Sequence, residues 1–330
     1  MSTETLTVEP ISLPTQQEYD GIPFPLILAC KSSDATVETV SEWVQANRNE
    51  LDAQASRHGT ILFRDFPLAT DQDFDAFISA FNYENFAYRD SLSNAVRVNR
   101  TPRVFTANEA PSEVTIFLHH EMAQTPIYPS RLFFFCEHAA EEGGATPLCR
   151  SDILFRELQK QCPQFADDCE QKGLLYSNVM PAVDDPKSGM GRSWQSTLRA
   201  ETKEAAEGRL RELGYSWEWL DDGCLRATTP VLPAVRTLPD GRKSFFNQLI
   251  AAAHWQDERN DSSKAITFGD GTPLDRDAVA TAVELGDQFA FDVPWQKGDV
   301  ALVDNFVVMH GRRPFVGTRK VLASLVAANV

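Results

Sequence analysis

The chain has 330 residues, and its 31 Lys and Arg residues against 47 Asp and Glu residues give a formal net charge of −16. So strong a negative charge argues against a protein that neutralises nucleic-acid phosphates or lies on an anionic membrane. The hydrophobic content of 42% is that of a globular protein, and a chain of this length buries about 75% of its unfolded surface. We therefore expect one folded domain over residues 1–330 and no nucleic-acid partner.

Neither a membrane span nor a disulfide framework is indicated. No window reaches the ~18 consecutive apolar residues of a membrane helix, and the amino terminus lacks the basic and apolar regions of a secretion signal. The six cysteines include no C-x-x-C pair, and a chain of this size does not need disulfides to fold. We expect reduced thiols and a cytoplasmic protein with no membrane association.

The first part of the chain combines a polar entry with two helices. Residues 1–35 are polar and contain several prolines, which predicts an N-terminal extension. Apolar residues recur at helical spacing from Thr36 to Gly59, and again in a segment opened by Asp71. The apolar run 60–63 between them predicts a strand.

Short strands dominate the rest of the chain. Strands are predicted at 114–118, 132–136, 215–220, 245–249, 289–293, 300–303 and 321–326, and helices at 153–159 and 203–213. Residues 180–196 are rich in Gly, Pro, Ser and Asp without apolar periodicity, which predicts a lid loop. Strands of irregular spacing without β-α-β alternation predict a mainly β chain, a β-sandwich or jelly roll that carries helices.

The histidines suggest a metal site. His119 and Glu121 lie two residues apart in a predicted strand, so both point to one face, and His120 points to the other. His310, after the predicted strand 300–303, is the natural third ligand. Two His and one carboxylate form the facial triad of non-haem Fe(II) oxygenases. A zinc hydrolase would use the same ligand types, so these residues alone leave the metal open.

A second group of residues suggests a dicarboxylic acid. Arg319 follows His310 by nine residues, and its guanidinium can clamp a carboxylate through two hydrogen bonds. Thr146, after a Gly-Gly-Ala turn, adds a hydroxyl donor. An arginine and a threonine suit the far end of 2-oxoglutarate, which favours the iron oxygenase over the zinc hydrolase.

Several motifs resemble one family. They are HHEMAQ (119–124), PSRLFFFCE (129–137), GGATP (143–147), GRSWQST (191–197), AITFGDG (265–271) and VPWQKGDVALVDN…HGRRPF (293–315). In this order they resemble the clavaminate synthase-like branch of the taurine dioxygenase superfamily. The resemblance implies a double-stranded β-helix (distorted jelly roll) core with helical flanks and a long insertion. It also implies Fe(II), 2-oxoglutarate and O₂, with His119, Glu121 and His310 as metal ligands and Thr146 and Arg319 as co-substrate residues.

The resemblance further implies a reaction and a class of substrate. The family couples decarboxylation of 2-oxoglutarate to succinate and CO₂ with oxidation of an unactivated C–H bond. Related halogenases replace the acidic ligand by Ala or Gly, so Glu121 favours hydroxylation over chlorination. Relatives with this signature hydroxylate amino acids, some of them tethered to a carrier protein. We therefore expect an amino-acid-like small molecule, free or tethered to an acyl or peptidyl carrier protein.

Five residues are candidates for contact with the substrate. Arg192 and Trp194 lie in the predicted lid, Asn247 lies in the predicted strand 245–249, and Asn108 and Gln124 flank the first two ligands. A carrier protein is itself acidic, so it would need a local basic patch, to which Arg192, Arg199 and Arg242 are possible contributors. Two other functions stay open: a non-catalytic jelly-roll binding or regulatory protein, and a zinc hydrolase.

Overall fold

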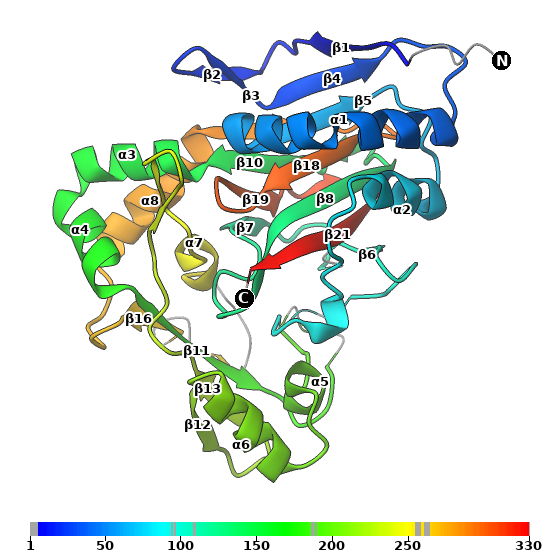
Figure 1. The fold of residues 1–330 in the computed structure, drawn as a ribbon. Helices are drawn as coiled ribbons and strands as arrows, with labels where there is room; N and C mark the ends of the chain where they lie inside the picture. The colour runs from blue at the N-terminus through cyan, green and yellow to red at the C-terminus, as the bar shows by residue number, and fades with distance from the viewer. Residues whose placement is uncertain are drawn as a thin grey trace.

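Two facing β-sheets form the centre of the molecule (Figure 1). The computed structural model describes residues 6–93, 95, 97–107, 110–185, 188, 190–254, 259–260 and 265–329. The larger sheet has the order β1 (Val8–Ile11), β4 (Leu26–Cys30), β5 (Thr60–Arg64), β18 (Val300–Asp304), β8 (Tyr128–His138), β21 (Lys320–Asn329) and β6 (Phe105–Thr106). The smaller sheet has the order β17 (Ala290–Val293), β10 (Thr146–Arg150), β19 (Val308–Arg312) and β7 (Ile116–His119).

The core of the sandwich fills the space between these sheets. It joins Leu62, Leu132 and Ala301 of the larger sheet to Leu148 and Phe291 of the smaller one. Neighbouring strands are antiparallel, as β18 is with β5 and β8, except that β4 and β5 run parallel. This arrangement is the double-stranded β-helix that the sequence predicted.

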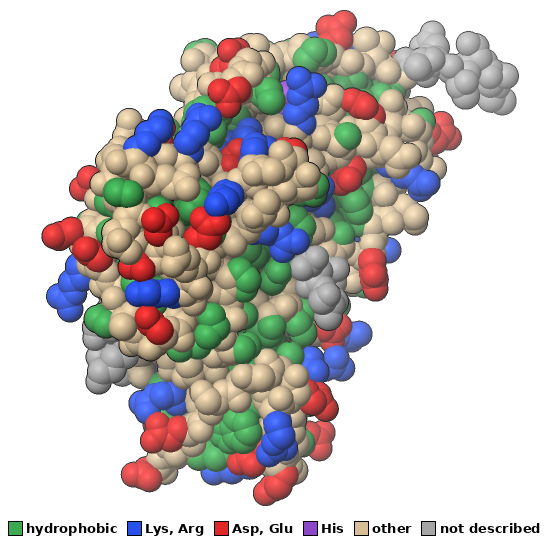
Figure 2. All heavy atoms as spheres, turned by 60° about the vertical axis from the view of Figure 1, so that its left-hand side comes forward, with side chains coloured by type: hydrophobic (Ala, Val, Ile, Leu, Met, Phe, Trp, Pro, Cys, Tyr) green, Lys and Arg blue, Asp and Glu red, His purple; other side chains and the backbone are tan. Residues whose placement is uncertain are grey.

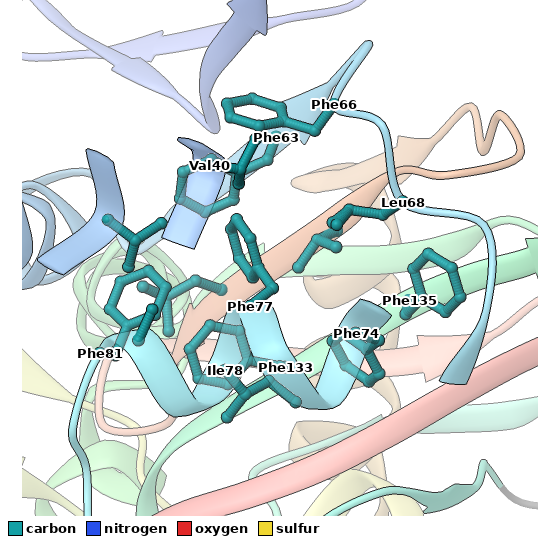
Figure 3. Packing of buried hydrophobic residues seen from close by; sticks show 14 of the residues in the cluster. Val40, Phe63, Phe66, Leu68, Phe74, Phe77, Ile78, Phe81, Phe133 and Phe135 are labelled. Carbon is teal, nitrogen blue, oxygen red and sulfur yellow. The ribbon is translucent and has the colours of Figure 1, made fainter. Parts of the chain in front are cut away.

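Two helices cover the outer face of the larger sheet. In both α1 (Val37–His58) and α2 (Asp71–Ala80), a threonine just before the helix caps the first turn through its side chain. Their apolar faces bury a cluster of phenylalanines (Figure 3). Phe74 stacks on Phe135 of β8 at a centroid distance of 5.0 Å, and Phe77 meets the edge of Phe63 at 5.1 Å.

The other helices flank the smaller sheet or belong to a separate lobe. α3 (Ser151–Gln161), α4 (Pro163–Lys172), α7 (Leu249–Ala252) and α8 (Arg276–Gln288) pack in a second apolar cluster. The lobe at the bottom of Figure 1 holds a sheet of β12 (Ser216–Trp219), β13 (Leu225–Thr228), β11 (Leu174–Met180) and β16 (Ile266–Phe268), with α5 (Trp194–Leu198) and α6 (Lys203–Glu212). This lobe is the long insertion between Glu121 and His310.

Short pairs of strands and one 3₁₀ turn complete the fold. They are β2 (Gln17–Tyr19) with β3 (Ile22–Phe24), β9 (Glu142–Gly143) with β20 (Phe315–Val316), β14 (Arg236–Thr237) with β15 (Lys243–Ser244), and the turn η1 (Tyr88–Asp90). No helix in the described part of the chain is both long and apolar enough to cross a membrane.

Four sequence predictions need correction. The chain mixes helices and strands rather than being mainly β. Residues 1–35 are not merely an extension, because β1 and β4 join the larger sheet. The run 245–249 is not a strand, because α7 begins at Leu249. In the predicted lid 180–196, residues 186, 187 and 189 lie outside the described part, whereas Arg192, Ser193 and Trp194 are buried.

The phenylalanine cluster predicts a large stability cost on truncation. Phe77→Ala removes a ring buried between α2 and β5, so we expect the free energy of unfolding to fall by about 3–5 kcal/mol. Val316→Ala, at a side chain that is 57% exposed, should change it by less than about 0.5 kcal/mol. Urea denaturation followed by circular dichroism measures both, and equal effects of the two substitutions would contradict this packing.

Candidate metal centre

Two side chains from adjacent strands and one from the turn after β7 meet in one small cavity. β7 and β19 pair so that His119 and His310 lie directly opposite each other, with ring centroids 4.4 Å apart. Nε2 of His310 is 3.3 Å from Oε2 of Glu121. One ligand atom from each of His119, Glu121 and His310 lies within 4.8 Å of the others. The strand pairing therefore brings residues 189 positions apart in the sequence to one point.

Glu121 reaches this point from a turn, not from the strand. β7 ends at His119, and Met122 adopts a left-handed conformation with φ of 59°. The buried amide of Asn305 holds the turn: its Oδ1 accepts from the backbone N of Glu121 at 2.8 Å. Its Nδ2 donates to the carbonyls of Glu121 at 3.0 Å and Pro129 at 2.7 Å. The sequence predicted that the strand continues to Glu121. Instead, hydrogen bonds from Asn305 fix the backbone of Glu121.

His120 points away from the metal centre, as the sequence predicted. Its Nε2 is 2.9 Å from the hydroxyl of Ser151, and its Nδ1 contacts the backbone carbonyl of Asn305. Burial lowers the pKa of His120 to about 3, so this ring is neutral. It fastens the turn to α3 and to the segment after β18.

The charges in the cavity suit a divalent metal. Burial, followed by the neighbouring His310, lowers the pKa of His119 to about 4, which keeps this imidazole neutral and able to act as a ligand. Burial alone would raise the pKa of Glu121, but Arg97 and His310 lower it to about 2. Nδ1 of His119 lies 2.7 Å from the carbonyl of Phe117, which leaves Nε2 for a metal. Neutral imidazoles and a carboxylate are ligands that Fe(II) accepts.

Arg97 is part of the site, although the sequence analysis missed it. Its Nη2 is 3.4 Å from Oε1 of Glu121, and its guanidinium lies 5.0 Å from the ring centroid of Tyr88 and 5.4 Å from that of Phe105. Its Nε is buried and has no hydrogen-bond partner in the described part of the chain. Arg97 follows a segment without helical or strand periodicity, so no pattern in the sequence indicated that it belongs to the metal site.

The predicted co-substrate residues contact each other at the edge of the same cavity. Nη2 of Arg319 donates to Oγ1 of Thr146 at 3.2 Å, and Nε of Arg319 donates to the carbonyl of Gly144 at 2.7 Å. Trp295, which sequence reasoning also missed, donates its Nε1–H to Oγ1 of Thr146 at 3.0 Å. Because Thr146 accepts two hydrogen bonds, its own proton is available for a ligand.

Three of the predicted substrate residues make contacts within the protein, away from the metal cavity. Arg192 donates to backbone carbonyls of Ser91 at 2.8 Å and Ser196 at 2.9 Å. Trp194 packs edge-on against Trp219 with centroids 5.1 Å apart. Asn247 donates to the carbonyl of Ala234 and accepts from the backbone N of Leu249. None of the three is among the described residues that line the metal cavity.

The remaining two candidates are not placed at the metal. Asn108 lies outside the described residues. Gln124 lines a separate small cavity that Asn178 and Thr197 also line, and its Oε1 has no hydrogen-bond partner in the described part of the chain. Its contact with substrate stays a prediction.

Comparison with known proteins agrees with this geometry. The family model "Taurine catabolism dioxygenase TauD, TfdA family" matches residues 25–325. The chain belongs to this family. It is an Fe(II)- and 2-oxoglutarate-dependent dioxygenase with the facial triad His119, Glu121 and His310. This assignment sets aside both the zinc hydrolase and the non-catalytic protein.

Relatives and solved structures cover nearly the whole chain. A clavaminate synthase-like protein of Arabidopsis thaliana is 39% identical over 98% of this chain and 99% of its own. The dapdiamide synthesis protein DdaC of Enterobacter agglomerans is 29% identical over 93% of this chain and 92% of its own. The crystal structure of PvcB from Pseudomonas aeruginosa, 13% identical, has a TM-score of 0.56 and covers 99% of this chain and 93% of that chain. The structural likeness supports the double-stranded β-helix fold.

The position of Glu121 depends on Asn305, which predicts a metal-binding defect in a variant with intact ligands. Asn305→Ala removes two hydrogen bonds to the turn and one to Pro129 of β8, so we expect Fe(II) affinity to fall about tenfold to a hundredfold. Anaerobic Fe(II) titration measures the affinity, and circular dichroism shows whether the variant is folded. Unchanged affinity in a folded variant would show that the turn keeps its shape without this side chain.

Proposed function

We propose that this enzyme hydroxylates an unactivated C–H bond of an amino-acid-like small molecule in the cytoplasm, with succinate and CO₂ as co-products. The observation that carries the proposal is the pair of arginines, Arg97 and Arg319, in the cavity of the facial triad. All six cysteines are unpaired thiols, which agrees with a reducing compartment. Glu121 supports hydroxylation over chlorination because it fills the position that a halide would need.

Arg319 and Thr146 would bind the distal carboxylate of 2-oxoglutarate. Nη1 of Arg319 has no hydrogen-bond partner in the described part of the chain, and the Thr146 proton points to no acceptor there. Burial, followed by the charge of Arg312, lowers the pKa of Arg319 to about 10. The guanidinium is still cationic at neutral pH, and an anionic ligand would restore its charge balance.

Arg97 would bind a carboxylate of the substrate. Beside the imidazoles of His119 and His310, the described ionic residues that line the cavity are Arg97, Arg312 and Arg319 against Glu121. Fe(II) and doubly charged 2-oxoglutarate together add no net charge, so the excess of positive charge remains after both have bound. A buried excess charge is costly unless it is paired. A substrate carboxylate beside Arg97 would supply that pairing.

The residues of the chain divide the work of the reaction among them. When bound, Fe(II) supplies O₂ activation and the redox chemistry. His119, Glu121 and His310 would hold the metal through two imidazoles and one carboxylate. Arg319 and Thr146 orient the co-substrate, and Arg97 orients the substrate. Ile116, Phe134 and Val321 line the cavity with apolar groups and limit the entry of water.

The carrier-bound form of the substrate has less support than the free form. Of the proposed basic patch, Arg192 is buried and bonded to backbone carbonyls. Arg199 pairs with Asp90 at 2.5 Å, and Arg242 lies at a different cleft from the metal cavity. Equal rates on a free amino acid and on the same amino acid tethered to a carrier would support the free substrate.

The triad predicts how activity is lost. A panel of free amino acids should stimulate succinate formation in the presence of Fe(II), 2-oxoglutarate and O₂, and the product should be heavier by one oxygen atom. His119→Ala and His310→Ala should abolish succinate formation because each removes a metal ligand. His138→Ala, at an exposed histidine of β8, is the matched control and should keep full activity. Turnover in both triad variants would refute the proposal.

The role of Arg97 predicts a change in substrate binding. Arg97→Gln should raise KM for a carboxylate-bearing amino acid about tenfold, whereas it should change KM for the corresponding carboxamide little. The affinity for Fe(II) should change as well, because Arg97 pairs with the metal ligand Glu121, so the comparison of acid and amide at saturating Fe(II) isolates the effect on the substrate carboxylate. Arg100→Gln, in the same segment, is the control. An equal change in KM for the acid and for the amide would show that Arg97 does not bind the substrate carboxylate.

A further inference from the structure

A large cleft lies apart from the metal cavity. It has a volume of about 990 Å³ and shares no lining residue with the cavity around the triad. Its walls come from the β2–β3 hairpin, the end of α1, the start of α3 and the segment 238–243 (Figure 1). Nothing in the reaction described above uses it.

This cleft is rich in cationic side chains, although the protein is strongly acidic. Six cationic side chains line it: Arg57, Arg131, Arg150, Arg156, Arg242 and Lys243. Four aspartates line it as well, and two carboxylates outside the lining, Asp52 and Glu170, pair with Arg131 and Lys243, so the cleft is close to neutral within a chain that carries −16. Figure 2, which turns this side of the molecule forward, shows Lys and Arg side chains gathered in its upper part.

Not every cationic nitrogen in the cleft has a hydrogen-bond partner within the described residues after ion pairing. Asp152 is shared by two arginines: it accepts from Nε of Arg150 at 2.7 Å and from Nη1 of Arg242 at 2.8 Å. Arg150 is only 3% exposed, and its Nη1 has no hydrogen-bond partner in the described part of the chain. A buried guanidinium nitrogen without an acceptor costs free energy, which an anionic ligand would recover.

A second cation lies close to this group. Arg242 also contacts the carbonyl of Ser56 at 3.4 Å, which places it beside the neighbouring Arg57. Arg57 is exposed, and within the described residues it has no ion pair. Arg156, on α3, pairs with Asp20 at 3.3 Å, but both side chains are largely exposed, so solvent weakens this pair. A ligand could therefore draw on Arg57 and Arg156 as well as on Arg150.

The remaining walls of the cleft are apolar or aromatic. Tyr19 and Ile22 lie on the hairpin side, Phe155 on α3, and Phe306 and Leu238 on the facing segments. Such walls suit an organic group larger than a bare ion. Arginine guanidinium groups bind phosphate oxygens through paired hydrogen bonds, so Arg57 and the exposed Arg156 could bind a phosphate group at this cleft.

We propose that this cleft binds a small organic phosphate, with the phosphate group against Arg57, Arg150 and Arg156 and the organic part against the apolar walls. The site is separate from the metal centre, so the proposal does not depend on the identity of the oxidised substrate.

Calorimetry with four probes tests this site at constant ionic strength. The probes are adenosine monophosphate, phosphopantetheine, inorganic phosphate and inorganic sulfate, a dianion without an organic part. At least one organic phosphate should bind in a saturable manner, about tenfold tighter than inorganic phosphate and sulfate. The two organic probes distinguish a nucleotide from a pantetheine ligand.

Substitutions then locate the binding. Arg57→Ala and Arg156→Ala change exposed side chains, so both variants should fold, and each should weaken binding of the organic phosphate about fivefold to tenfold. Arg48→Ala, at an exposed arginine on α1 outside the cleft, should leave it unchanged. The proposal is overturned if no organic phosphate binds, if sulfate binds equally well, or if Arg48→Ala weakens binding as much as Arg57→Ala.

Discussion

A single buried amide, that of Asn305, connects the two halves of the metal centre. Asn305 lies directly after β18, and its side chain binds the backbone of the turn that contains Glu121. The backbone carbonyl of Asn305 also contacts His120. The pairing of β7 with β19 then sets His119 opposite His310. Without the amide, the turn would have to satisfy its backbone groups elsewhere, and the carboxylate would lose its fixed position beside the two imidazoles.

Charge imbalance is the second constraint on this protein. The metal cavity has more guanidinium groups than carboxylates, and so does the cleft beside α3. Both are exceptions in a chain with a net charge of −16. In the metal cavity the excess fits the carboxylates of a co-substrate and of a substrate. In the cleft, the exposed cations Arg57 and Arg156 and the unpartnered nitrogen of Arg150 lead to a phosphate, and the apolar walls lead to an organic group attached to it.

Much of the site could be predicted from the sequence because it lies on regular elements. The spacing of His119 and Glu121 and the strand before His310 were visible in the pattern, and the two helices between Thr36 and Ala80 were marked by their caps and apolar spacing. Arg97 and Trp295 were missed because each lies in an irregular segment, where periodicity carries no information. The predicted strand at 245–249 failed for a related reason: short apolar runs look alike in strands and buried helices.

The substrate residues were the hardest to predict. Arg192 and Trp194 looked like parts of a lid because their segment lacks apolar periodicity, yet both are buried in the lobe that holds α5 and α6. Arg192 donates hydrogen bonds to backbone carbonyls there, a role that the local sequence does not reveal. Asn247 likewise serves the backbone around α7. The amide of this polar residue in an apolar segment is thus satisfied by hydrogen bonds to the backbone.

The most direct measurement is a crystal structure of the protein with Mn(II) and N-oxalylglycine, an unreactive analogue of 2-oxoglutarate. The account predicts Mn(II) bound by His119, Glu121 and His310, with the distal carboxylate of the analogue on Arg319 and Thr146 and with Arg97 still unoccupied by the analogue. A metal held by other residues, or a distal carboxylate bound at Arg97, would contradict it.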